Sequence, residues 1–459
     1  MINPEESYEF TTKSKSNKAG NKGFITSSTL NLYAFTTAFF SRIIDTLGAP
    51  SIINFIHFAV IPLACIITLL TSKHNNKERI RTTNLVLGAL FLLLITIIVS
   101  AIVNEAGMIN VILDFMLLAE PFIFLVSIIY VPISAAKFIR LKKWVFRCFW
   151  IHLSLVFIQK YILKTDTWAW LGMEGADRIQ GAFFISGAGH VVGCSVSLMF
   201  AVYYFAQAKK SPMWLRILVV ILAMWNIIIA DGKQVLFAFM LAMVLLFLIK
   251  LNDITAVFQY LIGGAILGIV LWWCIANVPA FAAFNTWIRP EIYGPDGDAT
   301  LLKTSVFRII PTHYDSILNY FFGLGPGHTV GRLGGWMLPK YADLLEPLGS
   351  TIHPASKEAW QAVGSSWLGN QSSMFSPLFG WAGIWGDLGF MGLAAYLYLC
   401  FIVWQRICVT DITRFFMLTV FVFGWIFSQM EEPGYMLSVS YILGIHYQEH
   451  MINKTKSQY

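Results

Sequence analysis

Charged residues are scarce in this sequence. Asp, Glu, Lys and Arg make up 12% of the 459 residues, whereas a soluble globular protein carries about 25%. Hydrophobic residues make up 57% and aromatic residues 15%. This composition excludes an ordinary soluble domain and predicts an all-α polytopic membrane protein, since only helices and closed barrels satisfy their backbone hydrogen bonds in lipid.

Cysteine is also scarce, and its placement excludes two further classes. All six cysteines lie in or beside apolar segments, and residues 279–383 contain none. A disulfide framework and a cysteine metal site are therefore not expected. The first 28 residues lack the apolar core of a signal peptide, so we interpret 1–28 as a disordered cytoplasmic tail. No repeat of fixed period is present, and the net charge of +7 does not indicate nucleic-acid binding.

Apolar segments of about the length that crosses a bilayer occupy most of the chain. Transmembrane helices 1–9 are predicted within 29–278 and helices 10–12 within 384–447, about twelve in all. The predicted spans are 29–48, 51–70, 84–103, 109–132, 145–163, 181–206, 215–231, 234–250, 258–278, 384–404, 415–430 and 435–447. The first contains Arg42 and Asp45, so an amphipathic helix lying on the membrane surface is the alternative there.

The distribution of Lys and Arg predicts the orientation, because basic loops stay in the cytoplasm. The connections near 71–83, 134–144, 207–216, 250–257 and 405–414 carry fourteen Lys and Arg. Those on the opposite side carry Lys164, Arg178 and Lys233 only. Both termini, including a tail over 448–459, are therefore expected in the cytoplasm. The multi-pass chain is expected in the cytoplasmic (inner) membrane, with 279–383 as one large external loop between helices 9 and 10.

Two short polar segments between apolar spans are candidate anion-binding sites. Arg178 lies in Asp-Arg-Ile-Gln-Gly-Ala-Phe-Phe at the external boundary, where a guanidinium can hold a phosphate through its planar fork. The alternative is a snorkelling arginine partnered by Asp177. Lys233 lies in Ala-Asp-Gly-Lys-Gln, where charge near a membrane is often functional. Alternatively, Asp231 and Lys233 simply neutralise each other.

The large loop contains most of the remaining candidates. Arg289 and Arg308 can hold a diphosphate and stabilise it as a leaving group. His313 and Asp315 can form a base and the group that orients it, although histidines in wet loops are usually solvated. Asp296 and Asp298 have a spacing that can bind a divalent ion, but their Gly-Pro-Asp-Gly-Asp context is typical of a turn. We therefore predict no metal site and no cofactor.

A glycine-rich segment follows at Phe322-Gly-Leu-Gly-Pro-Gly-His328. Backbone amides in such a segment can approach a phosphate, so Gly325, Gly327 and His328 are candidate substrate-binding residues, as is His353. A tight loop without a ligand is the alternative. The loop tryptophans, among them Trp336 and Trp360, suit either stacking on sugar rings or an interfacial aromatic belt.

The order of these segments resembles the O-antigen polymerase and ligase superfamily of bacterial envelope glycosyltransferases. The resemblance covers about residues 170–447 and rests on Arg-x-x-Gly-x-Phe from Arg178, a short basic turn at Lys233, an early loop arginine, "FGLGPG", and the Gly-x-Leu-Gly-x-x-Gly-Leu motif from Gly386. By position, Arg178 and Arg308 match arginines of the family. Lys233 stands where the family usually has arginine.

The resemblance implies an inverting glycosyl transfer outside the cytoplasmic membrane. The donor would be an oligosaccharide repeat unit on a polyprenyl diphosphate, and a polymerase would extend it into O-antigen, capsule or exopolysaccharide. Chain-length regulators and flippases are the protein partners that it implies.

One departure weakens the ligase interpretation. Ligases carry a His-Asn pair before the glycine-rich re-entry, and Asn370 to Pro377 contains no histidine, so the general base stays unassigned. A flippase or transporter is the main alternative from another class, although transporters commonly consist of repeated halves. A scaffold protein of a polysaccharide-synthesising complex is a further alternative.

Overall fold

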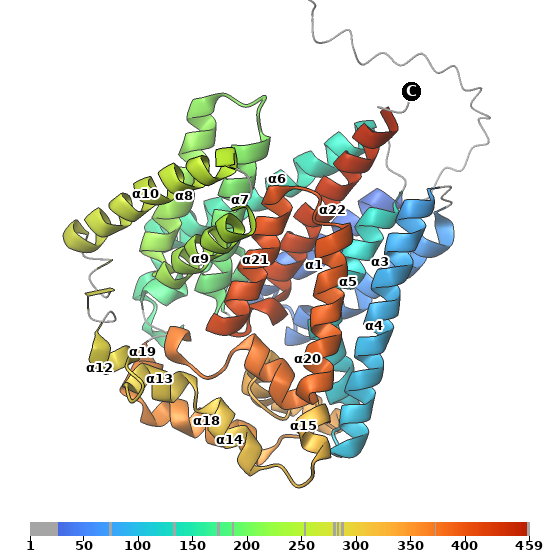
Figure 1. The fold of residues 1–459 in the computed structure, drawn as a ribbon, viewed down its shortest axis with the longest axis vertical. Helices are drawn as coiled ribbons and strands as arrows, with labels where there is room; N and C mark the ends of the chain where they lie inside the picture. Colours follow the sequence, from blue (N-terminus) through green and yellow to red (C-terminus); the bar gives the residue numbers. More distant parts are fainter. Residues whose placement is uncertain are drawn as a thin grey trace, which may run out of the picture.

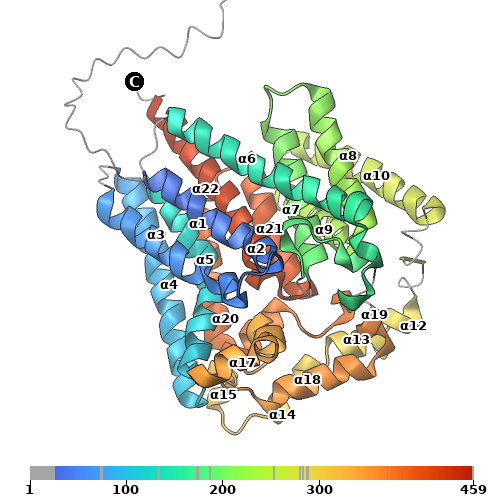
Figure 2. The ribbon, with the colours of Figure 1, turned by 180° about the vertical axis from the view of Figure 1, so that it is seen from behind.

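The computed structural model describes residues 26–456, apart from 73–75, 132–134, 172–174, 186–187, 252–253, 279–280, 282–283, 286–288 and 372. Almost all of the tail predicted over 1–28 therefore lies outside the described residues. The described part is helical throughout and contains no strand. The long helices pack side by side, and the short helices of residues 290–371 form a layer at the end of the molecule opposite the C-terminus (Figures 1 and 2).

The elements before the large loop are α1 (Ser27–Phe39), α2 (Ser41–Thr46), η2 (Ser51–Phe55), α3 (His57–Thr71), α4 (Lys77–Val103), α5 (Met108–Tyr130), α6 (Ala135–Phe157), η3 (Ile158–Leu163), η4 (Thr165–Thr167), η5 (Ala169–Leu171), η6 (Ala176–Arg178), η7 (Gly181–Phe183), α7 (Gly189–Gln207), α8 (Met213–Ile229), α9 (Lys233–Ile249) and α10 (Ile254–Asn277). The loop elements are α12 (Pro290–Tyr293), α13 (Asp298–Lys303), α14 (Val306–Thr312), α15 (Leu318–Phe322), η9 (Leu333–Met337), α16 (Leu338–Lys340), α17 (Ala342–Leu345), η10 (Glu346–Leu348), α18 (Pro354–Ser365), α19 (Trp367–Gln371) and η11 (Ser373–Phe375). The chain ends with α20 (Gly380–Arg406), α21 (Asp411–Ile426), η12 (Ser428–Glu431) and α22 (Pro433–Lys456).

Five helices in the described part are long and apolar enough to cross a membrane. They cover Lys77–Val103, Met108–Tyr130, Lys137–Leu163, Gly189–Gln207 and Gly380–Arg406. Four further apolar helices are shorter: His57–Thr71, Met213–Ile229, Lys233–Ile249 and Ile262–Asn277. The helices are compatible with a membrane protein, and the count of twelve spans stays a prediction.

Several predicted spans differ from the observed helices: residues 51–55 form the 3-10 helix η2 before α3 begins at His57, and two other spans contain larger breaks. Residues 29–48 form two helices, α1 and α2, with a break at Phe40. The helix predicted from residue 181 begins at Gly189, because Gly181 has a positive φ of 58° and residues 181–183 form only a 3-10 turn. Hydropathy is continuous across both breaks, so it does not reveal them.

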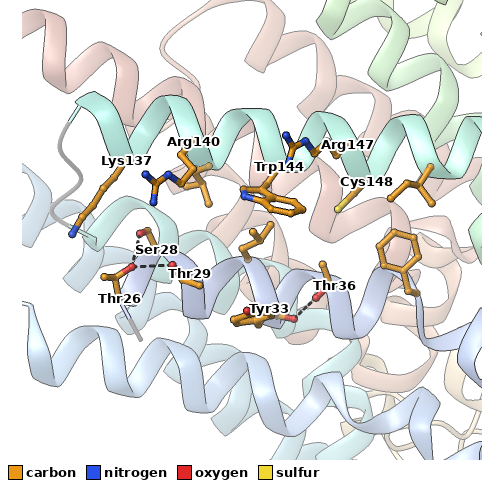
Figure 3. Close-up of a pocket in the computed structure, with 14 residues that line it drawn as sticks. Thr26, Ser28, Thr29, Tyr33, Thr36, Lys137, Arg140, Trp144, Arg147 and Cys148 are labelled. Atoms are coloured by element: carbon orange, nitrogen blue, oxygen red, sulfur yellow. Dashed lines mark hydrogen bonds between the residues drawn. The ribbon is translucent and has the colours of Figure 1, made fainter. Parts of the chain in front are cut away.

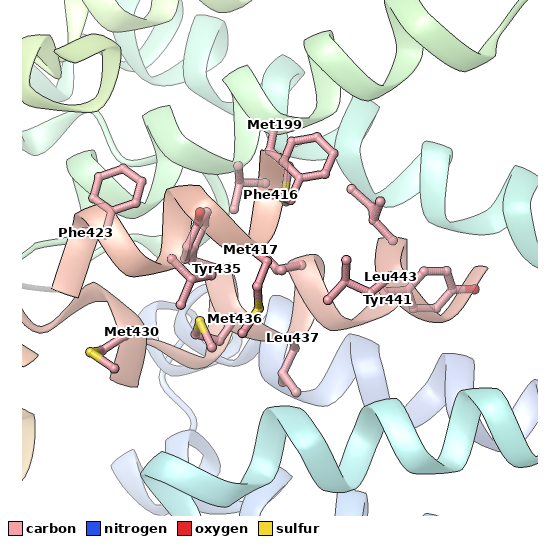
Figure 4. Close-up of a cluster of buried hydrophobic side chains, with 14 of the residues drawn as sticks. Met199, Phe416, Met417, Phe423, Met430, Tyr435, Met436, Leu437, Tyr441 and Leu443 are labelled. Carbon is pink, nitrogen blue, oxygen red and sulfur yellow. The ribbon is translucent and has the colours of Figure 1, made fainter. Parts of the chain in front are cut away.

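The core lies between α5 and its neighbours. Helix α5 packs against α3, α4 and α22, α20 packs against α4, and α21 packs against α9. Large apolar side chains from α21, η12 and α22, with Met199 of α7, fill one part of this core (Figure 4). Methionine fills irregular gaps between helices, and Met199, Met430 and Met436 serve this purpose here.

The basic connections meet at one end of the bundle. Lys454 near the end of α22 pairs with Glu78 at the start of α4 at 2.7 Å, and Lys142 of α6 lies 4.0 Å from Glu449. The layer of loop helices lies at the other end (Figures 1 and 2). The fold therefore separates the predicted cytoplasmic residues from the predicted external loop.

The loop layer is joined to the bundle through α15 and α20. Gly389 has a φ of 64° inside α20, and a side chain there would place Cβ 2.3 Å from the carbonyl carbon of Phe321. Gly323 also has a positive φ, and a Cβ there would lie 2.4 Å from the carbonyl carbon of Asp387. These two glycines allow the two backbones to touch.

We expect Gly389→Ala to lower the melting temperature and the yield of the protein strongly. The new Cβ meets backbone and adopts an unfavourable φ, so α15 and α20 must separate. Thermal unfolding in detergent measures the effect. Gly263→Ala is the matched control, since nothing lies within 4 Å of a Cβ at that position, and an equal loss in both variants would contradict the explanation.

Candidate functional site

Two small cavities lie where the start of α3, the segment 332–341 and the start of α22 meet. Arg42, Asn54, His57, Arg332 and Pro433 line both. The cavities have volumes of about 40 and 20 Å³. Each has room for one water molecule or a few. We call these cavities and their polar lining the arginine site.

Two arginines reach the arginine site from distant parts of the chain. Arg42 of α2 donates from Nη1 to the Tyr341 hydroxyl at 3.0 Å. The buried Arg332 follows the glycine-rich segment, and both guanidinium groups lie over the ring of Trp336, at 5.5 and 5.1 Å from its centre. Burial, and then repulsion from Arg42, lowers the pKa of Arg332 to about 9. Arg332 is thus still cationic at neutral pH.

Two adjacent glutamates hold Arg332 in place. Its guanidinium forms an ion pair with Glu432, and its backbone amide donates to Glu431 at 2.7 Å. The Nε atom of Arg332 and the Oε1 atom of Glu431 are buried without a hydrogen-bond partner among the described residues. Burying a polar atom without a hydrogen bond costs free energy. A ligand or water molecule that enters the cavity would give Arg332 Nε a hydrogen-bond partner.

A histidine and a carboxylate form the third part of the arginine site. His57 Nδ1 lies 2.7 Å from Glu120 Oε1, and both side chains are buried. A carboxylate in this position fixes the orientation and the tautomer of the imidazole. His57 also lines both cavities, beside Arg42 and Arg332.

The buried carboxylates continue beyond the cavities. Asp114 and Asp387 lie near enough to Glu431 for the three charges to repel one another. Burial, and then repulsion from Asp387, raises the pKa of Glu431 to about 8. Glu431 is therefore mostly protonated at neutral pH, and Glu432 supplies the negative charge that balances Arg332.

This shift predicts that acid stabilises the protein. The folded protein keeps a proton on Glu431 that the unfolded chain releases above its ordinary pKa of 4.5, so stability falls as pH rises from about 4.5 to about 8. We expect the melting temperature to fall over this range and Glu431→Gln to reduce the fall. Glu346→Gln, at an exposed position, is the control; an unchanged pH dependence in Glu431→Gln would contradict the prediction.

The structure brings two of the sequence-predicted segments together. Asp177 of η6 lies 3.6 Å from His190 Nε2, and Lys233 pairs with Asp231 at 2.7 Å. Both aspartates lie close enough to Cys194 to act on it electrostatically. Arg178 is half-buried and donates to the carbonyl of Asp166 at 2.8 Å. Arg178 and Lys233 therefore belong to one polar cluster, which we call the η6–α9 cluster.

The η6–α9 cluster adjoins the arginine site through α7. Phe183 and Val192 line the larger cavity, and His190 stands two residues before Val192. Gln429 of η12 donates to Ser195 at 2.6 Å. The two groups of charged residues thus flank one stretch of η7 and α7.

The other loop candidates lie away from the cavities. Arg308 is exposed, and its guanidinium donates to Thr304 and to the carbonyl of Leu301 within its own segment. Arg289 is exposed as well. His313 bonds to Glu358 at 2.8 Å, so the orienting group is Glu358 rather than the predicted Asp315, which is exposed.

The glycine-rich segment holds a carboxylate of the protein itself. The amides of Gly327 and Thr329 donate to the two carboxylate oxygens of Asp387, at 3.0 and 2.7 Å, and the amide of Gly325 donates to the Asp387 carbonyl. These amides are the ones predicted to approach a phosphate. In the structure they join the segment to α20 and fix the position of Arg332, five residues after Gly327.

The predicted histidines His328 and His353 stack at 5.5 Å between ring centres, with His313 beside them at 5.4 Å from His353. His328 is buried and bonds to the Leu324 carbonyl and the Thr351 hydroxyl. Burial, and then repulsion from the other two histidines, lowers the pKa of His353 to about 4. Its side chain caps α18, which is a structural role.

The sequence alone does not predict the arginine site. Arg42 stands out only as a charge in a predicted span, and no motif marks His57, Glu120 or Arg332. Charged residues in apolar segments often mark functional sites, so Glu120 within Met108–Tyr130 was the signal available. Nothing in the sequence joins it to Arg332.

The fold and the site define the class of this protein: an all-helical chain with apolar helices of membrane-spanning length and a buried charged site beside its loop layer. A scan against protein-family models finds no match, and a search of curated proteins finds none either.

Proposed function

We propose that this protein is a polysaccharide polymerase that joins polyprenyl-diphosphate-linked oligosaccharides by inverting glycosyl transfer. The observation that carries the proposal is the convergence of Arg42, Arg332 and the His57–Glu120 pair on one cavity. Two arginines that repel each other across a cavity suit a dianionic group, because its charge relieves the repulsion. The sequence resemblance supplies the identity of that group as a lipid diphosphate.

The proposed chemistry assigns a role to each part of the arginine site. A hydroxyl oxygen of the acceptor sugar forms a bond to the anomeric carbon of the donor, and the bond from that carbon to the diphosphate oxygen breaks. His57 accepts the proton of the hydroxyl, and Glu120 stabilises the resulting imidazolium. Arg42 and Arg332 hold the departing polyprenyl diphosphate, whose charge increases as the bond breaks.

The η6–α9 cluster supports a polymerase over a ligase. A polymerase binds two lipid-linked substrates, and a ligase binds one together with a different acceptor. Arg178 and Lys233 would bind the second diphosphate, as their family positions imply, while Arg308 and Arg289 would meet substrates at the exposed loop face. Each of two diphosphates would then have a cation-containing cluster beside α7, and in the η6–α9 cluster the diphosphate would replace Asp231 as the partner of Lys233.

The cavities are too small for a sugar diphosphate, so the donor must displace part of the wall. The segment 332–341 covers the arginine site and belongs to the loop layer. Loops that close over a substrate exclude water from the reaction. We propose that the structure represents the closed form and that this segment moves outward for entry.

Transport of a lipid-linked oligosaccharide is the second candidate function, and the buried acids favour it. Asp114 and Glu120 lie in Met108–Tyr130, and Asp387 lies in Gly380–Arg406. Ionisable residues inside such helices are typical of proton pathways in transporters.

One experiment separates these functions. The purified protein in lipid vesicles receives one polyprenyl-diphosphate oligosaccharide and no other acceptor, and the products are separated by size. A ladder of lipid-linked multiples is expected for the polymerase. Transbilayer movement of the substrate without a ladder would indicate a transporter, and products formed only after addition of a different acceptor would indicate a ligase.

A further inference from the structure

A groove with a volume of about 400 Å³ runs between α1 and α6 (Figure 3). It is independent of the arginine site and shares no lining residue with it. At one end, hydroxyl groups of α1 and its N-terminal flank face two cations of α6. These residues are Thr26, Ser28, Thr29, Lys137 and Arg140.

The polar end of the groove carries two cations of α6, Lys137 and Arg140. Lys137 and Arg140 are exposed, and none of the described residues that line the groove is acidic. The hydroxyl of Thr26 bonds to those of Ser28 and Thr29, at 3.1 and 3.0 Å. Cations and hydroxyls together at one point are the donors that bind a phosphate group.

The groove becomes more apolar along its length. Tyr33 and Trp144 lie in its middle, and Cys148 lies toward the other end (Figure 3). Phe40 and Ile151 also line the groove. Arg147 lines it as well, with its guanidinium over the Trp144 ring at 4.5 Å from the ring centre. Lys137 to Ile151 span about 21 Å at a helical rise of 1.5 Å per residue. This length is about half of a complete bilayer of 40–45 Å, and tyrosine and tryptophan in the middle suit the boundary between headgroup and hydrocarbon.

The polar end lies at the basic end of the bundle. Helix α6 begins near the end of α22, as the contact of Lys142 with Glu449 shows, and away from the loop layer (Figure 2). Basic residues beside a helix end bind the anionic lipids of the adjacent leaflet.

We propose that this groove binds one anionic phospholipid from the leaflet at the basic end. Lys137, Arg140 and the hydroxyls hold the phosphate, and an acyl chain follows α6 past Trp144 to Cys148 and Ile151. The groove runs from Lys137 and Arg140 past the Trp144 ring, which Arg147 covers, to the apolar Ile151, and a lipid has the same order from phosphate to acyl chain. A free phosphate or a second protein would not use the apolar half in this way.

Native mass spectrometry of the full chain in detergent, titrated with phosphatidylglycerol, tests the proposal. Lys137→Gln/Arg140→Gln is expected to weaken the tightest phosphatidylglycerol site about thirtyfold, since each cation at an anionic headgroup contributes about 1 kcal/mol. Lys143→Gln/Lys209→Gln removes the same charge from exposed positions that do not line the groove. This control variant is expected to bind like the original protein.

Two further measurements distinguish the source of the phosphate. Ile151→Trp fills the apolar end of the groove, and because Ile151 is 48% exposed the change should leave folding intact. The variant keeps Lys137 and Arg140, and it is expected to bind phosphatidylglycerol more weakly than the original protein. Soluble glycerol phosphate is expected not to displace the lipid. Equal weakening in both double variants, no effect of Ile151→Trp, or displacement by glycerol phosphate would each overturn the proposal.

Discussion

Replacing His57 with Gln is expected to slow chain extension by a factor of about 10²–10⁴, the usual contribution of a general base. Gln keeps a hydrogen-bond donor for Glu120, so the buried pair should survive while proton transfer is lost. The rate of ladder formation, measured at saturating and limiting substrate, should show a lower kcat with little change in KM. A melting temperature close to that of the original protein would show that the fold is intact.

The matched control is His313→Gln. His313 also bonds to a glutamate, Glu358, at 2.8 Å, but it lies in the loop layer and does not line the arginine site. We expect this variant to retain activity. If His313→Gln lost chain extension while His57→Gln kept normal activity, His313 rather than His57 would be the general base.

Removing the positive charge of Arg332 is expected to have the second large effect on the rate of chain extension. We expect the rate of chain extension to fall by about 10²–10³, as for the loss of one stabilising donor at a developing charge. Arg332→Gln alone would leave Glu432 buried and unpaired, which costs about 3–5 kcal/mol. The informative variant is therefore Arg332→Gln/Glu432→Gln, in which two neutral amides replace the ion pair.

Two comparisons make this result decisive. Glu432→Gln alone keeps the cation and should retain most activity if Arg332 is what the substrate needs. Arg308→Ala tests the exposed arginine that the sequence resemblance selects. Full activity in the Arg332 double variant, with loss in Arg308→Ala, would move diphosphate binding from the cavity to the exposed face of the loop layer.

Much of the fold follows from hydropathy, because most of the long apolar runs contain a helix in the structure. The prediction of α4, α5 and α20 needed no more than this pattern. What hydropathy does not contain is local backbone geometry. The break at Phe40 and the delayed start of α7 depend on a few dihedral angles that a composition average does not reveal.

The arginine site was less accessible to prediction, for a different reason. Its residues come from positions 42, 57, 120, 332 and 432, and nothing in the sequence indicates that these distant positions meet. The sequence did identify the glycine-rich segment and the α20 re-entry as unusual. It could not show that the amides of the first bind the carboxylate of the second, because that contact joins residues 60 positions apart.

The residues of the arginine site lie far apart along the chain, and this spacing has a consequence for biogenesis. Glu432 and Pro433, which complete the wall beside Arg332, lie at the start of α22, whereas Arg42 lies in α2 and leaves the ribosome much earlier. During synthesis, Arg42 and the His57–Glu120 pair are made before Arg332 and Glu432, and the arginine site is complete only when α22 inserts. A chain interrupted anywhere before residue 432 therefore cannot assemble the arginine site, so truncated products should be inert toward substrate.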